Sequence, residues 1–155
     1  MKNLKAIATG ALLAVCCLHC GAQEKKIPIN EPDYHKPRVF TDLPQRMNLD
    51  LLSTASLLGS KTGAIVSLRL SDKLLLEGTV VSRSGEEDPS VASIVVRSTN
   101  RPGTTFTFTR TTNADGTYQY RGRILGRNNG DAYEIVNDKG MYVLEKRNLY
   151  DLLSE

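Results

Sequence analysis

Arginine is the residue type whose placement most suggests chemistry in this 155-residue chain. A guanidinium forms charge-assisted, often bidentate hydrogen bonds to carboxylates and phosphates. Six arginines fall on consecutive segments that we expect to be strands and turns: Arg97, Arg101, Arg110, Arg121, Arg123 and Arg127. If some of them share one exposed face, that face could receive an acidic partner, an anionic glycan or phosphate groups. All except Arg101 are our candidate partner-binding residues. The alternative is an ordinary solvated face that pairs with Glu134 and Glu145 across strands.

Catalysis through a nucleophile finds no support in the residue types. A Ser-His-Asp or Cys-His arrangement needs a base held beside the nucleophile. His35 is the only histidine after residue 22, and it lies in a proline-rich segment. Such a segment does not hold a base in a reactive geometry, so we interpret His35 as a solvated residue.

The acidic residues are better explained by turns than by catalysis. Residues 86–88 form a charged loop, and Asp115 and Asp131 stand where turns are expected. Neither of these two turns has the ligand spacing of an EF-hand, and zinc would find one histidine and no thiol after residue 22. We predict no enzyme, no metal and no cofactor. An enzyme that uses carboxylates alone would need acids that converge in one concave pocket.

Strands are the elements that must position the arginines. Phe106 and Phe108 alternate with threonines from Thr104 onward, which predicts a half-buried strand. Tyr118 and Tyr120 repeat the alternation. Seven strands are expected in all, at 64–70, 73–82, 91–98, from 104, from 118, 133–136 and 141–145. Their connections are too short for crossover helices, so we predict a mainly β, antiparallel meander that forms a barrel or a roll.

Two short apolar turns flank this meander. Leucines at 49–58 follow Asn48, a candidate N-cap, and end before Gly59, which predicts a short helix. A similar helical turn is expected from Asn148, and each of the two is expected to plug an open end of the sheet. The candidate core residues are Ile65, Leu68, Leu75, Val80, Ile94, Val96, Phe106, Phe108, Tyr118, Tyr120, Ile124, Tyr133, Ile135, Tyr142 and Leu144.

The first 22 residues have the pattern of an export signal. Lys2 and Lys5 precede an apolar run at 6–18, which is too short to span a bilayer core of about 30 Å. We expect cleavage after Ala22 and a periplasmic or extracellular protein with no membrane span. The signal, with Gly-Ala-Gln across its cleavage site, resembles those of exported Bacteroidetes proteins. The competing interpretation is a lipoprotein acylated at one of its cysteines, and we expect no such anchor because Val15, Cys16 and His19 precede them.

Residues 23–46 contain four prolines, which disfavour a helix and predict an extended arm. Val39, Phe40 and Leu43 could dock this arm on the β-rich domain, which we assign to residues 47–155. The arm could also add a strand to the sheet.

Export changes the charge of the chain. Removal of two lysines from the 20 basic residues leaves 18, against 17 acidic residues. The net charge therefore falls from +3 to +1, which gives no general attraction to nucleic acid. The aromatic residues are expected to face the core rather than to interleave with the arginines, which disfavours a stacking platform for bases.

Four short segments carry a family resemblance: residues 76–80, 90–96, 120–124 and 132–135. Their spacing of strands and glycines resembles the β-rich propeptide region of secreted reprolysin-type metalloproteases. The sequence departs from that family because it contains no HExxH motif and, after residue 22, no cysteine to act as a zinc-blocking switch. The resemblance implies a domain that binds or restrains a secreted protein.

Three functions remain open at this stage. The first is a non-enzymatic exported binding or accessory module that acts through contact with a protein partner. The second is a β-barrel carrier of a small apolar ligand. The third is a propeptide-like inhibitor of a secreted protease.

Overall fold

The computed structural model describes residues 35–152 of the chain. The predicted signal peptide, its cleavage and lipid-anchor alternatives, and the first part of the predicted arm lie outside these residues. Among the described residues, no helix is both long enough and apolar enough to cross a membrane.

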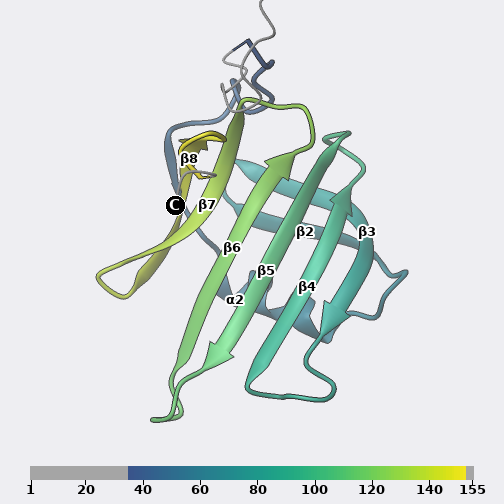
Figure 1. Cartoon of the computed structure of the whole chain (residues 1–155), viewed down its shortest axis with the longest axis vertical. Helices are drawn as coiled ribbons and strands as arrows, with labels where there is room; N and C mark the ends of the chain where they lie inside the picture. The colour runs from purple at the N-terminus through teal and green to yellow at the C-terminus, as the bar shows by residue number, and fades with distance from the viewer. Residues whose placement is uncertain (1–34, 153–155) are drawn as a thin grey trace, which may run out of the picture. The chain divides into compact units, whose positions relative to one another are not determined.

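The prediction of a mainly β, antiparallel meander is confirmed (Figure 1). The structure has eight strands rather than about seven, because β1 forms at the end of the predicted arm. The strands pair in the order β1-β8-β7-β6-β5-β4-β3-β2, and every pairing is antiparallel. Their bounds are β1 Arg46–Asn48, β2 Ile65–Ser71, β3 Leu74–Ser84, β4 Val91–Ser98, β5 Thr104–Thr112, β6 Tyr118–Gly126, β7 Asp131–Asp138 and β8 Met141–Asn148.

The sheet curls into a half-barrel whose two ends are joined by the chain between β1 and the helix. The N–H of Leu49 donates to the carbonyl of Tyr142 on β8 at 3.0 Å. The N–H of the next residue, Asp50, donates to the carbonyl of Leu70 on β2 at 2.8 Å. One dipeptide thus bonds to β8 and to β2, which stand close to opposite ends of the strand order. These two bonds hold the sheet in its curled form.

Alternation along the strands places the core on the concave face. Phe106 and Phe108 are fully buried, and they join Ile94, Val96, Ile124, Tyr133 and Leu144 in one apolar cluster. Most predicted core residues are confirmed, but three are wrong. Ile65 is 89% exposed and Leu75 is 39% exposed, because Leu68, Leu74 and Leu76 take the inward positions of β2 and β3. Tyr118 is 53% exposed, because it lies beyond the end of the core.

The short helix is present, with a different N-cap. The α-helix α2 spans Leu51–Ser56 and continues as the 3-10 turn η1, Leu57–Gly59. Asp50 caps it by accepting the N–H of Ser53 at 3.0 Å. Asn48, the predicted cap, belongs instead to β1 and pairs with Val143. At the other end of the chain, the described part of the predicted helical turn is a hydrogen-bonded turn over residues 149–152.

The end of the predicted arm docks on the half-barrel as expected, and we call residues 37–45 the strap. Phe40 is fully buried against Tyr133, with ring centroids 5.2 Å apart, and Leu43 is buried as well. Polar side chains hold the strap's backbone. The carboxylate of Asp131 accepts the N–H groups of Val39 at 2.8 Å and of Phe40 at 3.0 Å.

Three further side chains complete this clamp. The Lys146 ammonium donates to the carbonyls of Phe40 and Leu43, both at 2.6 Å. The Arg101 guanidinium donates to the carbonyl of Val39 at 3.2 Å and forms a two-pronged ion pair with Asp42. The Tyr133 hydroxyl donates to the carbonyl of Pro44. The strap is therefore an integral part of the fold, because its buried backbone groups have the hydrogen-bond partners that such groups require.

Candidate functional site

The candidate arginines do not lie together on one face. The strand alternation places three of them on the outer, solvent-facing side of the sheet: Arg97, Arg121 and Arg123. The buried phenylalanines lie on the opposite, inner side. Arg110 shares the inner face with Phe108 and lies over the ring of Tyr118, with 4.8 Å between its guanidinium carbon and the ring centroid.

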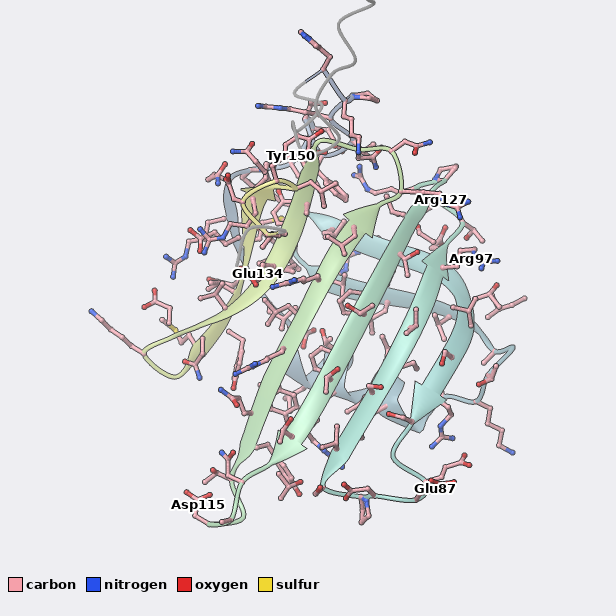
Figure 2. All side chains as sticks on the ribbon, in the orientation of Figure 1. Glu87, Arg97, Asp115, Arg127, Glu134 and Tyr150 are labelled. Atoms are coloured by element: carbon pink, nitrogen blue, oxygen red, sulfur yellow. The ribbon has the colours of Figure 1, made fainter. Side chains whose placement is uncertain are left out.

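The remaining arginines lie in turns. Arg127 is exposed in the connection from β6 to β7, and Arg101 belongs to the clamp on the strap. Figure 2 shows Arg97, on β4, well apart from Glu134 on β7. Only Arg121 and Arg123 therefore stay together as neighbours on one strand.

These two arginines line an opening in the middle of the sheet. Strand β6 pairs with β7 over only three residues, Arg123 to Leu125, opposite Ala132 to Glu134. Beyond that point β7 and its hairpin partner β8 swing away from β6 (Figure 1). The segment of β6 from 118 to 122 therefore has β5 on one side and no strand on the other. We call this gap, a cleft of about 620 Å³, the β6–β7 opening.

Backbone groups of β6 point into the opening. In the hairpin before β6, the N–H of Asn113 donates to the carbonyl of Thr117 at 2.8 Å. Thr117, just before β6, therefore bonds on the β5 side. Successive residues of a strand direct their backbone groups to opposite neighbours, so the odd-numbered residues of β6 also bond to β5. Tyr118 and Tyr120 therefore direct theirs toward the opening. The N–H of Tyr120 is held there by a side chain, since it donates to the hydroxyl of Tyr142 at 3.2 Å.

Apolar side chains form the floor of the opening. The rings of Tyr120 and Tyr142 meet edge to face, with centroids 5.4 Å apart. Buried Ile135 packs over Gly122, since a Cβ added at that glycine would stand 2.7 Å from the Ile135 Cδ1. The opening thus combines a free strand edge with an apolar base.

Charge on the rim is mostly positive, because three arginines and one glutamate line the opening: Arg121, Arg123, Arg147 and Glu134. The Nη2 of Arg123 lies 3.1 Å from the Oε1 of Glu134, and the Nε of Arg147 lies 3.5 Å from its Oε2. The exposed Arg121 guanidinium makes no ion pair or hydrogen bond with the residues that the structure describes. One cation on the rim therefore lacks a counter-charge.

A larger cleft of about 750 Å³ lies between residues 61–62 and the loop that carries Glu87 (Figure 2). Its charges are mixed, with Arg83 lying 3.6 Å from Glu86 and with two further acids beside them. Because both signs of charge line it, this cleft offers less selective recognition of a charged partner than the rim of the β6–β7 opening.

Two of the acids that were predicted to stabilise turns, Asp88 and Asp115, form hydrogen bonds within their turns. Hydrogen bonds from the Ser90 hydroxyl and N–H lower the pKa of the Asp88 carboxyl, and Thr117 lowers the pKa of Asp115 in the same way. Asp131 differs, because its carboxylate holds the strap. His35 is exposed. In the part of the chain that the structure describes, no group of three or more His, Cys, Asp or Glu side chains could hold a metal ion.

Comparisons with protein-family models, with curated proteins and with solved structures find no match to this chain. The function must therefore be argued from the geometry of the chain itself.

Residue types alone did not point to the β6–β7 opening. Arg121 and Arg123 were singled out for their charge, but Tyr120, Ile135 and Tyr142 were expected only as core. The one sequence signal was the alternation in β6, which places both arginines outward while Tyr120 faces the floor.

Proposed function

We propose that this chain is an exported, non-enzymatic binding module that takes up an extended segment of a protein partner in the β6–β7 opening. The observation that carries the proposal is the edge of β6, whose Tyr118 and Tyr120 face a gap instead of a strand. An exposed strand edge is a template for an added strand, in which main-chain hydrogen bonds supply affinity and side chains supply specificity.

The hydroxyl of Tyr142 fits this proposal as a placeholder. It accepts the Tyr120 N–H at 3.2 Å, so this donor is not left unpaired while the opening is empty. An added strand would replace the hydroxyl with a carbonyl and would use the Tyr120 carbonyl as well. Among the alternatives, the carrier gains no support from the half-barrel, whose interior is filled by Phe40, Phe106, Phe108 and their neighbours.

A designed peptide tests the proposal. The probe is acetyl-Gly-Glu-Val-Thr-Val-Thr-amide with a fluorophore at its carboxyl end, and its first valine is meant to lie opposite Tyr120. Its control carries proline in place of that valine, because proline cannot donate a backbone hydrogen bond. Fluorescence anisotropy with the full chain should show saturable binding of the probe and none of the proline control. Equal binding of both peptides, or binding of neither, would overturn the proposal.

Variants of the protein place the binding at the opening. Tyr142→Phe removes a hydrogen bond that binding must break, worth about 1 kcal/mol, and should tighten binding about fivefold. Tyr118→Phe is the matched control, because the exposed Tyr118 hydroxyl makes no hydrogen bond with the residues that the structure describes. It should leave the affinity unchanged. A tightening by both variants, or by neither, would show that the peptide binds elsewhere.

A further inference from the structure

One ion pair lies at the end of the β6–β7 opening, where β6 and β7 are still paired, and it shows which side chain an arginine of β6 meets on a neighbouring strand. Arg123 and Glu134 stand directly opposite each other on the outer face, with 3.1 Å between Nη2 and Oε1. The next pair along, Ile124 and Tyr133, is the one whose backbone groups face each other, so Arg123 and Glu134 form the closer, non-hydrogen-bonded kind of pair. At such a position the two side chains meet directly.

Arg121 repeats this arrangement without the acid. It lies two residues from Arg123 on the same outer face of β6, where β7 has already turned away. It is exposed and makes no ion pair with the described residues, and Arg123 and Arg147 add positive charge on the same rim.

Strand β7 does not hold the missing acid. If the pairing of β6 with β7 were extended in its present register, Val136 would come to lie opposite Arg121, because Glu134 lies opposite Arg123. The nearest acid beyond it on β7, Asp138, is already paired with Arg46 on β1. Strand β7 therefore offers Arg121 no counter-charge, and neither does any other residue that the structure describes.

We infer that the partner segment carries an aspartate or glutamate opposite Arg121, followed by an apolar residue that rests on Tyr120 and Tyr142. This inference rests on the proposed function, whose added strand fixes the register. The acid would form a cross-strand ion pair with Arg121, as Glu134 does with Arg123. The apolar residue would face the floor of the opening, because neighbouring residues of a strand point to opposite faces.

The charge at one position of the probe tests the inference. The glutamate of the probe is replaced by glutamine or by lysine, and the three peptides are compared by anisotropy at low salt. An exposed cross-strand ion pair contributes modestly, so the glutamate peptide should bind about threefold tighter than the glutamine peptide, with the lysine peptide weakest. In 0.5 M salt the three affinities should converge, because salt screens exposed charges.

A charge reversal in the protein completes the test. Arg121→Glu should reverse the order, so that the lysine peptide binds best. Arg97→Glu is the matched control, because Arg97 is an exposed arginine on the same outer face that does not line the opening. It should keep the original order. Equal affinities of the three peptides, or an unchanged order in Arg121→Glu, would overturn this inference and leave the proposed function standing. Binding of none would overturn the proposed function itself.

Discussion

The clamp on the strap makes a quantitative prediction about stability. Asp131 is 2% exposed, and its carboxylate accepts two backbone N–H groups of the strap, at 2.8 and 3.0 Å. A hydrogen bond to a charged group contributes about 1.5–3 kcal/mol. Asp131→Ala removes both bonds and leaves two donors without an acceptor. We expect it to lower the free energy of unfolding by about 3–5 kcal/mol, which is a large part of the stability of a small domain.

Equilibrium unfolding in urea, followed by circular dichroism, measures this loss. Asp131→Asn keeps one acceptor oxygen, so it should cost about half as much and stay measurable if the alanine variant does not fold. Asp138→Ala is the control, because the ion pair of Asp138 with Arg46 is exposed and should contribute at most about 1 kcal/mol. The reasoning is refuted if Asp131→Asn unfolds at the same urea concentration as Asp138→Ala.

Other predictions follow from single contacts. Burial and the nearby carboxylate of Asp131 raise the pKa of Tyr133 to about 12. The folded state therefore holds the Tyr133 proton more tightly than the unfolded state does. The contribution of Tyr133 to the free energy of unfolding should be full below about pH 10 and fall as the pH rises toward 12. Urea titrations of Tyr133→Phe should lack this fall. Hydrogen bonds from Arg101 lower the pKa of Asp42, so its contribution should be lost as the pH falls through that lowered value, and acid unfolding of Asp42→Asn should show a weaker pH dependence. Gly78→Ala should cost about 2 kcal/mol or more in urea, because its Cβ would stand 2.3 Å from the Arg97 carbonyl oxygen, whereas Gly59→Ala, with no atom within 4 Å, should be neutral.

Local patterns in the sequence were enough to predict the strands. The alternation of Phe106 and Phe108 with threonines predicted β5 and its buried face, and short polar turns predicted the antiparallel order. The same rule could have excluded Ile65, because Leu68 lies three residues away and an odd separation places two side chains of a strand on opposite faces. The real cap, Asp50, was missed because Asn48 is an equally good cap by type, and only its pairing in β1 excludes it.

The strap clamp and the β6–β7 opening could not be predicted in this way, because both depend on contacts between distant residues. Asp131 bonds to residues more than ninety positions earlier, and nothing in its turn-like surroundings indicates that role. The opening depends on where the pairing of β6 with β7 stops, and on the hydroxyl of Tyr142, which reaches a backbone group 22 residues away. Arg121 and Arg123 were found by their charge, but which of them lacks a partner is decided by the path of β7.

The central claim is that the edge of β6 is open and accepts a strand, and amide hydrogen exchange resolved by NMR tests it most directly. In Tyr142→Phe, the Tyr120 N–H loses its acceptor, so it should exchange quickly, while the N–H groups of Gln119 and Arg121, directed to β5, exchange slowly. Addition of the glutamate probe should slow exchange at Tyr118 and Tyr120 and leave Gln119 and Arg121 as they were. Slow exchange of Tyr120 before the probe is added, or protection by the probe confined to β2, would contradict the account.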